Sequence, residues 1–134
     1  MPSIITTFLE SSAALIGGRV VLTSFFWIAG IFGLLNFAVV VEEMKGAGLP
    51  MPGAFAVATI ICQLIGSVLI ITNVAGLGWL GAGALGVFTL LSIPLGHPFW
   101  TYEGPRRMQE FQIALEHIAV TGGMLLAAIL SIRT

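Results

Sequence analysis

The sequence predicts an all-α integral membrane protein, a four-helix bundle in which each helix crosses the bilayer. Of its 134 residues, 57% are hydrophobic and only 8% are charged, whereas soluble domains carry about 25% charged residues. A chain of this composition lacks the polar surface needed to cover a water-soluble globule. A membrane span takes about 20 mostly apolar residues, and four stretches meet this requirement: residues 20–41, 52–72, 77–95 and 111–132.

The charge balance and the cysteine count exclude several classes of function. A formal net charge of −1 with five Lys and Arg residues gives no basic surface for a polyanion, so nucleic acid is not an expected partner. Cys62 is the single cysteine, which excludes an intramolecular disulfide and a CxxC thiol relay.

The first span follows "MPSIITTFLESSAALIGG". This opening lacks the basic region of a secretory signal, and the apolar run after it is too long for a signal's hydrophobic segment. We therefore expect the segment to be retained and the first span to act as a signal anchor in a single-domain, multi-pass protein.

Polar and helix-breaking residues separate the spans. "EEMKGAGLPMP" follows the first span, and Pro52 suits the first turn of the second. "TNVAG" is a turn so short that the second and third helices are antiparallel neighbours. "PLGHPFWTYEGPRR" closes the third span and carries Trp100 and Tyr102, aromatic residues typical of a membrane interface.

Four spans place both termini on one side of the membrane and the 42–50 and 96–110 loops on the other. The basic residues do not fix which side is cytoplasmic, because their numbers near the two sides are similar. The loop side has Lys45, Arg106 and Arg107, and the terminal side has Arg19 and Arg133.

Small residues recur every four positions on two spans. Gly78, Ala82 and Gly86 form such a stripe on the third, and Ala29 and Gly33 on the first. Stripes of this kind let helix backbones approach closely in lipid. They favour a compact bundle. The alternative is a substrate groove in which the glycines form the base.

Ionisable and polar groups within the spans need a partner or a water-filled cavity. Arg19 at the edge of the first span is interpreted as an anchor that extends its charge to the membrane surface. Asn36 and Gln63 suit either an interhelical hydrogen bond or a ligand contact.

Glu116 and His117 are adjacent and lie about 8 Å inside the fourth span. Consecutive helical residues point about 100° apart, so the two side chains face different neighbours. Glu116 is either a carboxylate at the headgroup boundary, paired with Arg106 or Arg107, or a proton-transfer group with His117 as its complementary acid or base.

The candidate site has catalytic and ligand-binding members. Glu116 and His117 are the candidate catalytic pair. His97 and His117 lack a recognisable third ligand, so no metal or haem site is predicted. The candidate ligand-binding residues are Asn36, Gln63, Gln112, His97 and Trp100.

Several stretches resemble the DoxX-like family of small bacterial membrane proteins. "FFWIAGIFGLLNFAVVVEEMKGAGLPMP" is similar to the family's opening helix and the M-x-x-x-G-x-P loop after it. "HPFW" is similar to its aromatic linker, and "LEHIAVTGGMLLAA" to its closing stretch. Arg19 stands where the family has an early arginine. The resemblance extends over about residues 18–132.

The resemblance implies a four-helix protein of the bacterial inner membrane, linked to redox complexes. Some relatives are quinone-reducing subunits of thiosulfate oxidation, and others are membrane partners of oxidative-stress enzymes. The chain departs from the family at its polar positions. Gly33 stands in place of a lysine, Gln63 in place of a glutamate, and Glu116 and His117 in place of a lysine-asparagine pair. A role that depends on that lysine and glutamate does not transfer.

Three functions remain open from the sequence. The first is a subunit or partner of a membrane redox system that binds a quinone or another lipophilic ligand near Asn36, Gln63, Glu116 and His117. A redox partner protein would carry the bound cofactors, because the chain has no Rossmann glycine pattern, haem motif or redox cysteine pair. The second is a cofactor-free membrane isomerase or cyclase, and the third is a non-enzymatic scaffold. A homo-oligomer is compatible with each.

Overall fold

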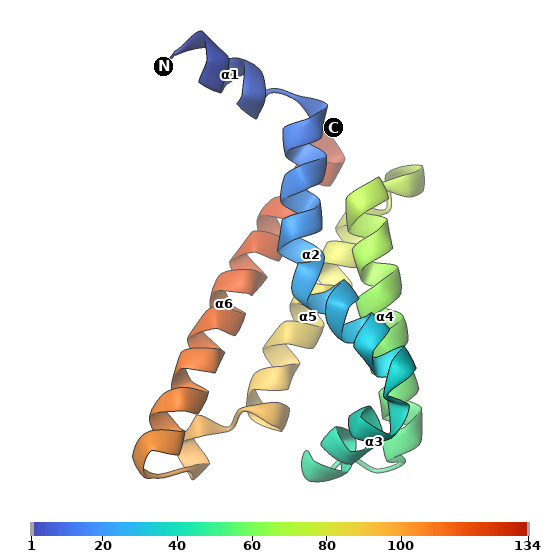
Figure 1. Ribbon diagram of the computed structural model, residues 1–134, viewed down its shortest axis with the longest axis vertical. Helices are drawn as coiled ribbons and strands as arrows, with labels where there is room; N and C mark the ends of the chain where they lie inside the picture. Colours follow the sequence, from blue (N-terminus) through green and yellow to red (C-terminus); the bar gives the residue numbers. More distant parts are fainter. Residues whose placement is uncertain (1, 134) are drawn as a thin grey trace.

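The computed structural model describes residues 2–133, and in that range its regular secondary structure is helical, with no strand. Four of its helices are long and apolar enough to cross a membrane, which confirms the predicted all-α membrane bundle (Figure 1). These four are α2 (Ser12–Leu35), α4 (Pro52–Thr72), α5 (Gly78–Gly96) and α6 (Gly104–Arg133). The shorter elements are α1 (Ser3–Leu9), α3 (Phe37–Gly46) and the 3-10 turns η1 (Val74–Gly76) and η2 (Phe99–Thr101).

The first span differs at both ends from the predicted residues 20–41. It begins earlier because Ser11 caps the helix, its Oγ accepting a hydrogen bond from the Ala14 N–H at 3.1 Å. It ends at Leu35 because Asn36 leaves the helical conformation, with φ −135° and ψ 52°. The chain then restarts as α3. A hydropathy profile does not detect this break, because the residues on both sides of Asn36 are apolar.

The fourth span also begins earlier than the predicted residue 111. The polar stretch from Gly104 to Glu110 is already helical, and Pro105 lies in its first turn, where the missing N–H costs no hydrogen bond. The second span matches the predicted residues 52–72, and the third begins one residue later than predicted, at Gly78.

Glycines set the distances between neighbouring helices. Gly30 and Gly33 of α2 lie against Leu64 and Ile60 of α4, where an added Cβ atom would meet those side chains at 2.7 and 2.9 Å. The helices contact one another mainly in the order α2, α4, α5, α6. Toward the end of the bundle that holds α3, the α2–α4 pair and the α5–α6 pair diverge (Figure 1).

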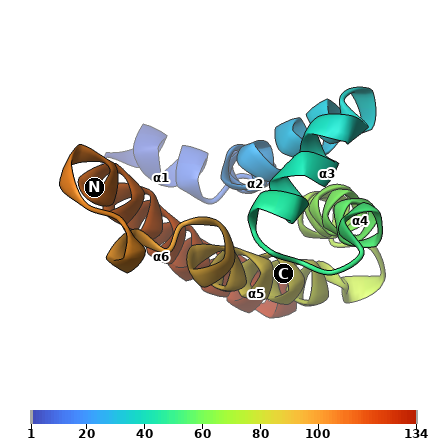
Figure 2. The same cartoon turned by 90° about the horizontal axis from the view of Figure 1, so that it is seen from below.

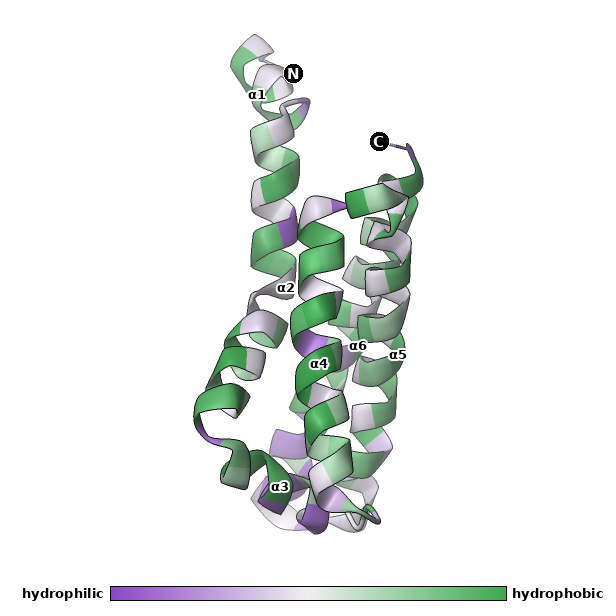
Figure 3. Ribbon diagram, turned by 90° about the vertical axis from the view of Figure 1, so that its right-hand side faces the viewer, coloured by the Kyte–Doolittle hydropathy of each residue, from purple (hydrophilic) through white to green (hydrophobic). Residues whose placement is uncertain are grey.

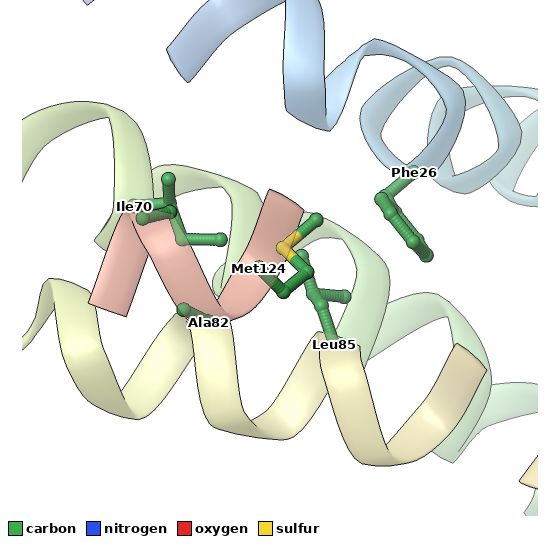
Figure 4. Close-up of a cluster of buried hydrophobic side chains, with 6 residues drawn as sticks. Phe26, Ile70, Ala82, Leu85 and Met124 are labelled. Carbon is green, nitrogen blue, oxygen red and sulfur yellow. The ribbon is translucent and has the colours of Figure 1, made fainter. Parts of the chain in front are cut away.

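The apolar core is small and lies where the four spanning helices meet. Its buried side chains are shown in Figure 4, with Phe26 from α2, Ile70 from α4, Leu85 from α5 and Met124 from α6. A second cluster forms where Val40 of α3 packs on α4. Most other large apolar side chains face outward, as lipid contact requires, and the spans are hydrophobic along their length (Figure 3).

The two ends of the described chain lie at the same end of the bundle, with α1 projecting from it (Figure 1). The view from below shows α3 and the loop before α6 together at the opposite end (Figure 2). We call these the terminal end and the loop end. This arrangement agrees with the predicted topology of four spans with co-sided termini.

Candidate functional site

Three titratable side chains gather at the loop end, where α5 stops and α6 runs past it. His97 is the residue that caps the C-terminus of α5, and its Nδ1 lies 2.7 Å from the Glu110 carboxylate of α6. The His97 and His117 rings form an edge-to-face contact with centroids 5.0 Å apart. We call His97, Glu110 and His117 the loop-end cluster.

The hydrogen bonds fix how both imidazoles are held. The His117 Nδ1 lies 2.7 Å from the Ile113 carbonyl oxygen, and a carbonyl can only accept, so Nδ1 carries the proton. An ionised Glu110 carboxylate would accept a hydrogen bond from the His97 Nδ1–H in the same way. In each neutral ring Nε2 then keeps its lone pair and can accept a proton. The cluster is thus suited to proton exchange.

The cluster is partly accessible. The side chains of His97 and Glu110 are 30% and 17% exposed, so protons can reach them from outside the bundle. No group of three or more His, Cys, Asp or Glu residues within 2–133 is arranged to hold a metal ion. Imidazole and carboxylate groups in contact are suited to acid–base chemistry.

An open cavity with two aromatic residues in its lining, Phe99 and Phe111, lies at the loop end. Phe99 of η2 contacts both Trp100 and Phe111 through edge-to-face ring pairs. The cavity has a volume of about 310 Å³, and its lining includes Phe99, Arg107 and Phe111. Trp100, a predicted ligand contact, borders Phe99 but is not part of this lining.

Glu116 lies apart from the loop-end cluster. It is exposed, while His117 is half-buried, so the two neighbours present different faces of α6. The alternative ion pair with Arg106 or Arg107 does not form within residues 2–133. Arg106 instead lies over the Tyr102 ring at 4.0 Å. The ring contact of His117 is with His97, and the catalytic roles of Glu116 and His117 stay a prediction.

Asn36 and Gln112 also lie outside the loop-end cluster. Asn36 is exposed, and its Nδ2 donates to the Phe32 carbonyl oxygen of its own helix at 3.1 Å. Of the two alternatives for Asn36, the interhelical hydrogen bond therefore does not form among residues 2–133, and the side chain supports the end of α2. The ligand contact stays a prediction. Gln112 is exposed on α6.

Gln63 is a nearly buried polar residue between the helices. It is 7% exposed and lies near the middle of α4. It faces Gly30 of α2, because a Cβ atom added to Gly30 would lie 3.5 Å from the Cβ atom of Gln63. Its side-chain amide makes no hydrogen bond to any residue from 2 to 133, although its backbone carbonyl accepts one from Ser67. Every fully buried side-chain N or O atom in this range has a partner. The unpartnered amide therefore keeps a small exposed surface.

Sequence reasoning did not identify the bond between Glu110 and His97. Glu110 and His117 are seven residues apart on one helix, a spacing that places them on the same face. That spacing was the available signal. The contact with His97 depends on where the loop from 97 to 103 returns, and no local pattern specifies that.

Comparison with known proteins agrees with the fold. The sequence model of the DoxX family matches residues 14–98, more than half of the chain, from α2 to the end of α5. The stretch "LEHIAVTGGMLLAA" in α6 lies outside this match. No curated protein and no solved structure matches the chain significantly. The extent of the family match shows that the chain belongs to the DoxX family.

Proposed function

We propose that this protein is a small membrane partner or subunit of a redox system and that it binds a quinone or a similar lipophilic carbonyl compound between its helices. Its location would be the inner (plasma) membrane of a bacterium. The observation that carries the proposal is the Gln63 amide, which is almost buried between the helices and has no hydrogen-bond partner within residues 2–133.

An unpartnered amide in this position is costly. Leaving a buried donor or acceptor unsatisfied costs about 1–3 kcal/mol, and within a bilayer no bulk water compensates for the loss. An amide N–H of Gln63 can donate to the carbonyl oxygen of a quinone, and the small exposed surface of the amide allows that contact. A ligand with this chemistry recovers the lost hydrogen bond.

The loop-end cluster supports the same proposal. Reduction of a quinone to a quinol takes two electrons and two protons, and one proton goes to each carbonyl oxygen. In this proposal a redox partner protein supplies the electrons, and His97 with Glu110 exchanges protons with water at the loop end. Gln63 would bind the ligand, and the loop-end cluster, at a separate position, would supply the protons.

Replacement of Gln63 by leucine tests the proposal, because leucine is of similar size and has no polar atoms. Gln63→Leu should leave the melting temperature in detergent unchanged or raised, since it removes an unsatisfied polar group. It should weaken the binding of a short-chain ubiquinone analogue about tenfold, as expected for loss of one hydrogen bond of roughly 1.4 kcal/mol. Titration followed by tryptophan fluorescence would measure the affinity.

Gln109→Leu provides the matched control, because Gln109 is an exposed glutamine on α6 that is not among the candidate ligand-binding residues. It should bind the analogue as the unmodified protein does. Equal affinities for the unmodified protein and Gln63→Leu would refute the proposed role of Gln63, and so would a lowered melting temperature with unchanged binding. Absence of quinone binding by the unmodified protein would refute the quinone as the ligand.

A further inference from the structure

A second cavity lies at the terminal end of the bundle, on the opposite side from the loop-end cluster. It has a volume of about 210 Å³ and opens between α2 and α6. Gly18, Arg19 and Leu22 line it from α2, and Gly123, Leu126 and Leu130 line it from α6. Because neither Gln63 nor the loop-end cluster takes part, this cavity is independent of the proposed quinone site.

Arg19 is the charged member of an otherwise apolar lining. It is only 9% exposed, and it lies about 10 Å from the start of α2, at 1.5 Å per residue. This position differs from the surface anchor expected from the sequence. No Asp or Glu is among the lining residues, and a charge in an apolar membrane setting favours an anion nearby.

The guanidinium can serve a ligand in addition to its contacts within the bundle. Arginine has five N–H donors in a planar fork that matches the oxygens of a phosphate group. A contact within the protein that uses one or two of these five donors leaves the others for an anion. Basic pockets between transmembrane helices near a membrane surface commonly hold the head groups of anionic lipids.

The apolar walls identify the rest of the ligand. Leu126 and Leu130 are 62% and 42% exposed, so the α6 side of the cavity faces the acyl region of the bilayer. Gly18 adds space, because a Cβ atom placed on it would have no neighbour within 4 Å. A free phosphate ion would bind the guanidinium but leave these walls uncovered, whereas an acyl chain covers them.

We infer that this cavity is a binding site for an anionic phospholipid, with the phosphate on Arg19 and an acyl chain along the leucines of α2 and α6. The lipid would fill the space between two helices that are joined directly over only a short stretch, where Leu22 lies against Gly123.

A pair of glycine variants tests the site without touching the charge. Gly18 and Gly17 are adjacent, both are exposed, and neither has a neighbour within 4 Å of an added Cβ, but only Gly18 lines the cavity. Gly18→Leu should fill the cavity and Gly17→Leu should not. Native mass spectrometry would measure retained lipid after incubation in detergent with equimolar phosphatidylglycerol and phosphatidylcholine.

The unmodified protein and Gly17→Leu should retain phosphatidylglycerol in preference to phosphatidylcholine. Gly18→Leu should lower the retention of phosphatidylglycerol about tenfold, because the leucine would exclude the lipid from the cavity. The lipid would then lose its charge-assisted contact with Arg19 and its apolar contacts. Arg19→Gln should abolish the preference, while Arg133→Gln, which removes the exposed cation at the same end, should not.

Two results would overturn the inference. One is equal retention of phosphatidylglycerol by Gly18→Leu and Gly17→Leu, which would show that the lipid does not occupy the cavity. The other is displacement of the lipid from the unmodified protein by inorganic phosphate alone, which would show that the site recognises a free anion. If Arg19→Gln does not fold, the comparison of Gly18→Leu with Gly17→Leu still tests whether the lipid occupies the cavity.

Discussion

At the scale of single residues, the bond between His97 and Glu110 ties the end of α5 to the first turns of α6. The two atoms lie 2.7 Å apart, and both side chains are more than two-thirds buried. Partial burial makes such a bond stronger than an exposed ion pair, which is commonly worth less than about 1 kcal/mol. The bond also holds His97 beside His117, so it positions the two imidazole rings.

A double-mutant cycle measures this bond. His97→Ala and Glu110→Ala should each lower the stability in detergent, and the double variant should be less destabilised than the sum by about 1 kcal/mol, because either single change already breaks the bond. Thermal unfolding followed by circular dichroism would give the values. The cycle of His117→Ala with Glu116→Ala is the control and should be additive. Additive effects at His97 and Glu110 would mean that the bond contributes nothing.

At the scale of helices, close packing depends on glycines that face a neighbouring backbone. Gly81 of α5 is the tightest case, because an added Cβ atom would lie 2.6 Å from the backbone oxygen of Gly66 in α4. A backbone atom cannot rotate away as a side chain can. The predicted stripe of Gly78, Ala82 and Gly86 is buried as well, and its Gly86 faces Met124 of α6.

Two glycine-to-alanine changes on α5 should have opposite effects. Gly81→Ala should destabilise the protein by about 1–3 kcal/mol, the usual cost of overpacking. Gly83→Ala meets no atom within 4 Å and should be neutral or stabilising by up to about 1 kcal/mol, the helix propensity gained over glycine. Melting temperatures in the same detergent would compare them. Similar values for the two variants would argue against the close approach of α4 and α5.

At the scale of the whole molecule, the chain forms a bundle with a terminal end and a loop end that carry different polar groups. Arg19 and its cavity lie near the terminal end, while the loop-end cluster and the aromatic residues around Phe99 lie at the other. A molecule placed across a membrane in this way presents different chemistry to its two surfaces.

Site-directed labelling tests this arrangement. In a Cys62→Ala background, single cysteines at Ser3 and Arg133 should react with an impermeant maleimide from one side of sealed vesicles. Cysteines at Lys45 and Glu103 should react from the other side, because each of the four spans runs from one end of the bundle to the other. Labelling of Ser3 and Arg133 from opposite sides would contradict an even number of spans.

The sequence by itself determined the fold class and most of the span boundaries. Lipid leaves a helical chain few alternatives, because every backbone polar group within the bilayer must be satisfied internally. The apolar runs therefore translate almost directly into helices, as residues 52–72 show. The helix breaks are less visible, because the end of α2 depends on the conformation of Asn36, with apolar residues on either side.

Only the tertiary structure decided which polar groups meet. Gln63, His97 and His117 were identifiable as polar residues in or near apolar spans, but their partners depend on helix rotation and on the path of the loops. A rotation of about 100° separates adjacent residues, and it leaves Glu116 exposed while His117 meets His97. Hydropathy specifies that a helix crosses the membrane, whereas its rotation is set by side-chain packing against the other helices.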